Sequence, residues 1–200
     1  MHCPELALVL VDVQRDFWRP LANLQPFASF PENMRRLLTA ARAHGLTVLH
    51  TQAFFAPSRS DWMLFYRPNG RGQIPCVSGT GGEVIEDFAA PKDGEPIIRK
   101  QTFDGFIGTN LEQSLRERKI KAILVAGLVT SVCVLFTATA AYVRRFVPIV
   151  VTDACADSPE SHDAALRIYD GLCFQSVTTA QVERDLPSVL RLAERFTPAP

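Results

Sequence analysis

The chain has no excess of charge of either sign. Its Lys and Arg residues number 21, its Asp and Glu residues also number 21, and no long run of like charges occurs. Proteins that bind nucleic acid or anionic membranes usually carry a basic patch or tail, so neither kind of partner is expected. Small molecules and further copies of the chain remain as the expected partners.

Cysteine is scarce, and its spacing excludes several kinds of site. The five cysteines are an odd number and form no CxxC pair, which argues against a zinc knuckle and a thioredoxin-like centre. The first residues also lack the basic and apolar segments of a secretion signal. We therefore expect a cytoplasmic protein with free thiols. The cysteines are Cys3, Cys76, Cys133, Cys155 and Cys173.

Cofactor motifs and clear membrane spans are also missing. No GxGxxG sequence follows the first apolar run, so no dinucleotide cofactor is expected. The glycines at 79–82 lack the Lys-Ser/Thr of a phosphate loop, and they predict a turn before a short helix. Residues 122–143 carry no charge and approach the ~20 residues that cross a bilayer, but Gly127 and several Ser and Thr residues interrupt them. A buried strand followed by a buried helix is the preferred interpretation.

Short apolar runs alternate with helical patterns along the chain. Residues 6–11 (LALVLV) are continuously apolar, as expected for a strand buried on both faces of a parallel sheet. Alternating strands and helices predict right-handed βαβ units and one α/β domain over residues 1–200, with helices on both faces of the sheet. Strands are expected at 6–11, 46–50, 96–100, 120–126, 147–152 and 173–177, and helices at 32–44, 83–88, 110–119, 131–145, 161–169 and 181–196.

Residues 53–78 predict a long loop rich in Pro, Gly, Arg and aromatic residues, and loops of this length are often functional. Arginines in or near it are candidates to bind a substrate carboxylate, although a solvated surface position explains each one alone better. These are Arg15, Arg59, Arg67 and Arg71. Aromatic residues are candidate pocket walls, with core packing as an equal alternative. These are Phe17, Phe55, Trp62, Phe103 and Phe106.

Three reactive side chains fall at the carboxyl ends of predicted strands, where ligands bind in parallel sheets. Asp12 follows the first strand, Lys100 ends the third, and Cys133 lies in the first turn of the helix after the fourth. A thiol attacks well only as thiolate, and a helix N-terminus, a carboxylate that takes its proton and a nearby ammonium all favour that form. Taken singly, the three residues also fit a buried thiol, a turn cap and a solvated strand end.

Several segments resemble the isochorismatase-like cysteine hydrolase superfamily. They are LVLVDVQRDF at 8–17, GTGGEVIEDF at 79–88, IIRKQTFDGF at 97–106, AGLVTSVCVLFTATAA at 126–141 and VTDACAD at 151–157. The resemblance extends over residues 6–177, and its most specific part is GLVTSVCV. It implies a three-layer α/β/α, Rossmann-like parallel sheet with the strand order 3-2-1-4-5-6, and it implies homo-oligomers, either dimers or tetramers.

The resemblance also implies a catalytic triad of Asp12, Lys100 and Cys133. In such a triad Asp12 takes the thiol proton, Cys133 attacks a carbonyl, and water later hydrolyses the acyl-enzyme, with no cofactor. A cis peptide between Leu128 and Val129 is implied as well. It would turn the Val129 N–H toward the Cys133 N–H to form an oxyanion hole.

Two departures from the family narrow the expected substrate. Relatives that hydrolyse nicotinamide carry a metal site of Asp and His after the second strand, whereas Ala53, Phe54 and Phe55 stand there in this chain. His50 is alone nearby, and zinc or iron needs three or four ligands, so no metal is expected. Isochorismatases proper carry a small residue at the Cys133 position. The expected substrates are therefore small amides, carbamoyl compounds or ureido compounds.

Three alternative functions remain open at this stage. A vinyl-ether hydrolase of the same fold predicts that Cys133→Ala keeps its activity. A catalytically silent binding module predicts a thiol of ordinary reactivity. A redox role for Cys133 would need a resolving cysteine, and none is evident from the sequence.

Overall fold

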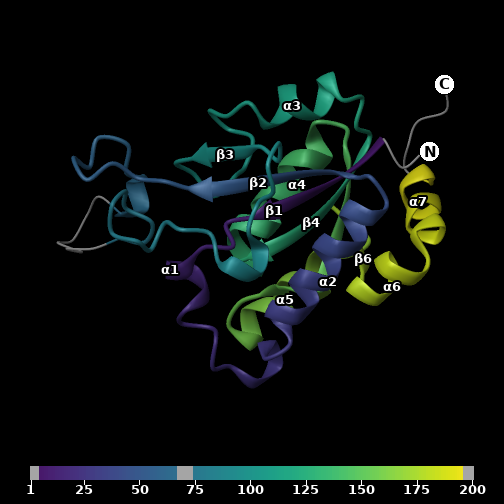
Figure 1. The fold of residues 1–200 in the computed structure, drawn as a ribbon, viewed down its shortest axis with the longest axis horizontal. Coiled ribbons are helices and arrows are strands. Elements are labelled where there is room, and N and C mark those ends of the chain that lie inside the picture. Colours follow the sequence, from purple (N-terminus) through teal and green to yellow (C-terminus); the bar gives the residue numbers. More distant parts are fainter. Residues whose placement is uncertain (1–4, 67–73, 196–200) are drawn as a thin grey trace.

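The structure is a computed structural model, and it describes residues 5–66 and 74–195. Within these residues, six parallel strands form one sheet in the order β3-β2-β1-β4-β5-β6 (Figure 1). The predicted α/β fold and its strand order are therefore confirmed. The strands are β1 (Leu6–Val11), β2 (Thr47–Ala53), β3 (Ile97–Lys100), β4 (Ala122–Leu128), β5 (Val147–Ala156) and β6 (Gln175–Val177).

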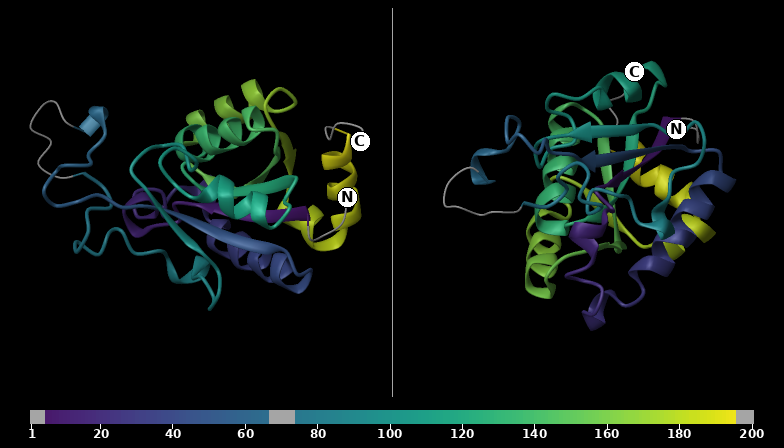
Figure 2. Two further views of the ribbon diagram at one scale, coloured as in Figure 1. Left: turned by 90° about the horizontal axis from the view of Figure 1, so that it is seen from above. Right: turned by 60° about the vertical axis from the view of Figure 1, so that its left-hand side comes forward.

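Helices cover both faces of the sheet, which completes the three layers. Figure 2 shows α2 on one side of the sheet and α4 with α5 on the other. None of the helices in the described residues is both long and apolar enough to span a membrane. The helices are α1 (Arg15–Trp18), α2 (Phe30–Ala43), α3 (Leu111–Glu117), α4 (Leu135–Val143), α5 (Pro159–Tyr169), α6 (Thr179–Arg184) and α7 (Leu186–Glu194).

Some element boundaries differ from the predicted ones. The helix expected at 83–88 is reduced to a single 3₁₀ turn, Asp87–Ala89, so the glycine turn at 79–82 starts no helix. The helix expected at 181–196 is two helices. The side chain of Asp185 accepts a hydrogen bond from the Ser188 N–H and caps α7, so the chain turns there instead of continuing α6.

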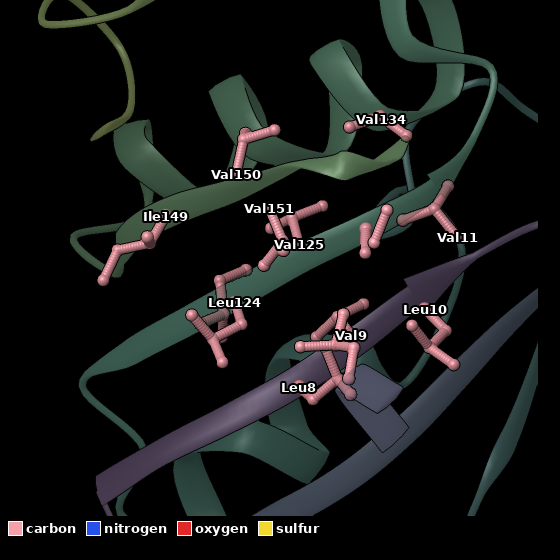
Figure 3. Close-up of a cluster of buried hydrophobic side chains, with 14 of the residues drawn as sticks. Leu8, Val9, Leu10, Val11, Leu124, Val125, Val134, Ile149, Val150 and Val151 are labelled. Atoms are coloured by element: carbon pink, nitrogen blue, oxygen red, sulfur yellow. The ribbon is translucent and has the colours of Figure 1, made fainter. Parts of the chain in front are cut away.

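The core is centred on β1, whose six residues are all buried. Figure 3 shows Leu8 and Val9 of β1 clustered with Leu124 and Val125 of β4, among residues of β5. A strand with apolar side chains toward both faces can only lie in the middle of a covered parallel sheet. This central position makes β1 a rigid support for the residues that follow it.

Gly127 allows the close approach of β4 to the end of β1. It pairs with Val11 at φ +127°, and a Cβ atom added there would lie 2.1 Å from the Val11 carbonyl oxygen. We expect Gly127→Ala to lower the free energy of unfolding by about 2 kcal/mol or more, because the backbone clash comes on top of the unfavourable φ. Urea denaturation would measure the change.

Gly45→Ala is the matched control for this prediction. Gly45 also has a positive φ, +68°, but nothing lies within 4 Å of its added Cβ. We expect its loss to be about 1 kcal/mol, which is the cost of the left-handed backbone alone. Equal losses in the two variants would show that the approach to Val11 has no steric consequence.

Candidate active site

The carboxyl ends of β1, β3 and β4 bring Asp12, Lys100 and Cys133 together. The Lys100 Nζ lies 2.6 Å from the Asp12 Oδ2, and both side chains are completely buried. Strand β2 runs between their strands, with Thr51 paired to Val11 and Ala53 paired to Lys100. The register of three adjacent strands therefore fixes this ion pair.

The two carboxylate oxygens of Asp12 have different surroundings. Oδ1 accepts a hydrogen bond of 2.9 Å from the Thr51 hydroxyl. Oδ2 has the Lys100 ammonium beside it and, among the described residues, no hydrogen-bond partner. Asp12 also has a left-handed backbone, φ +50°, held by hydrogen bonds from the Asp12 N–H to the Thr51 carbonyl and from the Gln14 N–H to the Asp12 carbonyl. Oδ2 is therefore the oxygen that is placed to accept a proton.

Lys100 is held in its charged form. Burial alone would lower the pKa of this ammonium, but the negative charge of Asp12 and the adjoining Cys133 side chain outweigh that effect and raise the pKa. The Nζ also donates a hydrogen bond of 2.7 Å to the Thr102 carbonyl. The ammonium thus provides a fixed positive charge at the centre of the site.

The surroundings of the Cys133 thiol favour its protonated form. Burial raises the pKa of this thiol, the Asp12 carboxylate raises it further, and Lys100 compensates only in part. Only 5% of the residue is exposed. At the start of the helix that carries Cys133, the Ser131 N–H already donates a hydrogen bond to the Asp157 carboxylate, so the helix N-terminus does not stabilise the thiolate alone. Burial and the Asp12 carboxylate therefore oppose the effect of Lys100 on this thiol.

The turn between β4 and Cys133 is anchored from a neighbouring strand and helix. The peptide bond between Leu128 and Val129 is cis, and residues 130–134 form one turn of π-helix. The Asp157 carboxylate accepts bonds from the Ser131 N–H and hydroxyl, at 2.8 and 2.6 Å. The Thr130 hydroxyl lies 2.8 Å from the His162 Nδ1. These contacts fix the backbone that leads into Cys133.

Gln14 is a further buried residue that the sequence alone does not reveal. Its Oε1 accepts a hydrogen bond from the Ala53 N–H, and its Nε2 donates to the carbonyls of Ala53 and Glu83, all at 2.8 Å. The side chain thus ties the ends of β1 and β2 to the segment after the glycine turn. The signal that could have identified it is its position, two residues after Asp12 at the carboxyl end of a buried strand.

Cys76 is a second thiol close to the triad. It is completely buried, and the pKa of its thiol is raised by burial and by the charges of Asp12 and Asp16. Its N–H donates to the Asp16 Oδ2 at 2.9 Å. Nothing in the sequence links Cys76 to Cys133, because 57 positions separate them; the long loop after β2 brings the two thiols into electrostatic reach.

The aromatic residues expected to line a pocket have different positions. Trp62 lines a cavity, whereas Phe55 is buried beside it in a small apolar cluster with Ile74 and Cys76. Phe17 packs against both this cluster and the main core.

The last two of these aromatics each contact other aromatic rings. Phe103 faces Phe65 and Phe136, with ring centroids 6.4 and 5.7 Å apart. Phe106 stacks on Phe146 within the core, which favours the packing interpretation for this residue.

The candidate arginines lie in different surroundings. Arg59 lines the same cavity as Trp62. Arg15 lies near the carboxylate of Glu86 and acts on its pKa. Arg67 and Arg71 lie outside the described residues. A different cavity, of about 400 Å³, lies at the amino end of β5 and contains no triad residue.

His50 bonds to Glu95 with its Nε2 3.1 Å from the carboxylate. Across residues 5–66 and 74–195, no group of three or more His, Cys, Asp or Glu side chains could hold a metal ion.

A covered parallel sheet with ionisable side chains gathered at its carboxyl edge places the molecule among the α/β proteins that bind small ligands there. The isochorismatase domain matches residues 6–182, and the chain belongs to this family. The predicted family and the predicted hydrolase class are both confirmed.

The relatives include named amidohydrolases. The chain is 26% identical over 213 residues to the ureidoacrylate amidohydrolase RutB of Methylorubrum extorquens, which covers 90% of this chain and 86% of that protein. An isochorismatase family protein from Desulfovibrio vulgaris superposes with a TM-score of 0.80 at 29% identity, over 94% and 98% of the two chains. N-carbamoylsarcosine amidase from Thermoplasma acidophilum gives 0.71 at 26% identity, over 88% and 96%.

Proposed function

We propose that this protein is a cysteine-dependent amidohydrolase that cleaves a C–N bond of a small amide, carbamoyl or ureido substrate. The observation that carries the proposal is the buried ion pair of Asp12 and Lys100, 2.6 Å apart, at the side of the Cys133 thiol. The names of two relatives, a ureidoacrylate amidohydrolase and an N-carbamoylsarcosine amidase, support this class of substrate.

The first half of the reaction forms an acyl-enzyme. Because the resting thiol is protonated, its proton passes to the Asp12 Oδ2 as the sulfur attacks the substrate carbonyl. The new S–C bond makes the carbonyl oxygen an oxyanion, and the Lys100 ammonium balances the negative charge. Asp12 then gives the proton to the leaving nitrogen, the C–N bond breaks, and ammonia or an amine departs.

The second half restores the thiol. Asp12 takes a proton from a water molecule, the resulting hydroxide attacks the thioester or thiocarbamate, and the C–S bond breaks. The proton returns from Asp12 to sulfur. In both halves the N–H groups of Val129 and Cys133 hold the oxyanion. The contacts of Ser131 with Asp157 and of Thr130 with His162 keep this turn in place.

Trapping the intermediate tests the proposal. Wild-type protein is screened for ammonia release from carbamoyl amino acids, ureido acids and simple carboxamides. The reaction with a substrate found in this screen is then quenched with acid during turnover. We expect peptide mass spectrometry to find the acyl group on Cys133 and on none of the other cysteines, because among the described thiols Cys133 alone contacts both Asp12 and Lys100 directly. Ammonia release with no adduct, or with an adduct elsewhere, would show that the nucleophile is wrongly assigned.

A further inference from the structure

A cavity of about 350 Å³ has walls from the segments that follow β1 and β2, at the carboxyl edge of the sheet where the triad lies; no triad residue is among its described lining. In Figure 1 the segment after β2 projects beyond the carboxyl ends of β2 and β3. On the triad side the wall is braced by Cys76, which binds the Asp16 carboxylate with its N–H and lies within electrostatic reach of Asp12 and Cys133. The lining residues are Asp16, Pro57, Arg59, Trp62, Ile74, Val77 and Thr80.

Arg59 gives this cavity an available positive charge. Its guanidinium lies over the Trp62 ring, 5.0 Å from the centroid, and it takes part in no ion pair within the described residues. The platform beneath it is fixed, since the Trp62 indole N–H donates to the Ala56 carbonyl and the Ala56 N–H donates to Asp61, each at 2.9 Å. A guanidinium stacked on an aromatic ring keeps its N–H edge for a carboxylate.

Asp16 gives the same cavity a fixed negative charge. Its backbone N–H bonds to the Gly82 carbonyl, and a Cβ atom on Gly82 would lie 1.9 Å from the Asp16 Oδ2. The glycine turn therefore closes around this carboxylate and holds it. Ile74, Val77 and the Trp62 ring form apolar walls in the same cavity.

We propose that this cavity is the subsite for the acidic end of the substrate, with Arg59 binding the carboxylate of a short ureido or carbamoyl acid. This inference rests on the proposed function, which places the carbonyl of the same molecule at Cys133. The apolar walls fit the carbon spacer between the two groups. Asp16 repels an anion from its own side, so the acid is directed to Arg59 and the carbamoyl end toward the triad.

Direct binding tests the subsite without requiring turnover. In a Cys133→Ala background, calorimetry would compare N-carbamoylglycine and N-carbamoyl-β-alanine, each against its neutral methyl ester. We expect the acid to bind more tightly than the ester. Adding Arg59→Gln should lower the acid-to-ester ratio of affinities by about 10- to 100-fold, as for loss of one charge-assisted contact.

Two further variants make the result specific. Arg35→Gln removes an exposed arginine of α2 and should leave the ratio unchanged, and Arg59→Lys should restore part of it. An unchanged ratio in Arg59→Gln, or no measurable binding of either acid to the background protein, would overturn the subsite. A lowered ratio in a protein that releases no ammonia from any substrate would overturn the proposed function and leave the subsite standing.

Discussion

Cys133→Ala is expected to lower kcat for ammonia release by about 10⁴-fold or more, in line with the loss of a catalytic nucleophile in other hydrolases. The substituted side chain has no atom that can form the acyl-enzyme. Asp12 and Lys100 remain paired in the variant, because their 2.6 Å contact and the Thr51 hydrogen bond do not involve the thiol. The measurement is the initial rate of ammonia release on the substrate found in the screen.

The controls distinguish a chemical from a structural loss. Cys173→Ala removes a half-buried cysteine at the far cavity and should keep the wild-type rate. Asp12→Asn should lose about as much activity as Cys133→Ala, and the double variant little more, because the two residues act on one proton. A Cys133→Ala protein that releases ammonia at the wild-type rate would show that Cys133 is not the nucleophile of this reaction.

Lys100→Met is expected to lower the free energy of unfolding by about 3–5 kcal/mol, the usual cost of removing one partner of a buried ion pair. Methionine fills much the same space, but the Asp12 carboxylate would be left in a completely buried position with no countercharge. Urea denaturation at pH 7 would measure the loss. The double variant Asp12→Asn with Lys100→Met leaves no buried charge at this position, and it should regain a large part of the stability.

The pH dependence of this effect has a definite sign. The folded structure raises the pKa of Lys100 despite its burial, so the stabilising effect is fully present below the unfolded value of about 10.4. It is lost only as the pH rises through the still higher folded pKa. We therefore expect the difference between wild type and Lys100→Met to persist from pH 7 to 9. A difference in the free energy of unfolding that vanishes between pH 7 and 9 would contradict the assigned ion pair. A double variant less stable than either single variant would contradict it as well.

The sequence predicts the sheet and its reactive edge well because both depend on short-range patterns. The apolar run at 6–11 has the boundaries of β1, and the alternation of elements gives the parallel sheet on which Asp12, Lys100 and Cys133 meet. The sequence does not predict that the helix expected at 83–88 shrinks to a single turn, or that the last helix is divided at Asp185. Single capping contacts and the path of the surrounding chain decide both features.

The supports of the site were also missed, for a different reason. Gln14 reaches Ala53 and Glu83, and Asp157 reaches Ser131, across 26 to 69 positions of sequence. No local periodicity indicates a contact at such a separation. The same holds for Arg59, which the sequence offers as one of four arginines and which only the folded loop places over Trp62 beside Asp16.

The burial of Cys133 and the raised pKa of its thiol have a consequence for oxidative damage to the protein. Peroxides and soft electrophiles react with thiolates, and a thiol whose pKa is raised offers them little of that form. Burial raises the pKa of the neighbouring Cys76 thiol in the same way. We therefore expect a site that ionises its sulfur only while a substrate is bound to keep its thiol intact between turnovers.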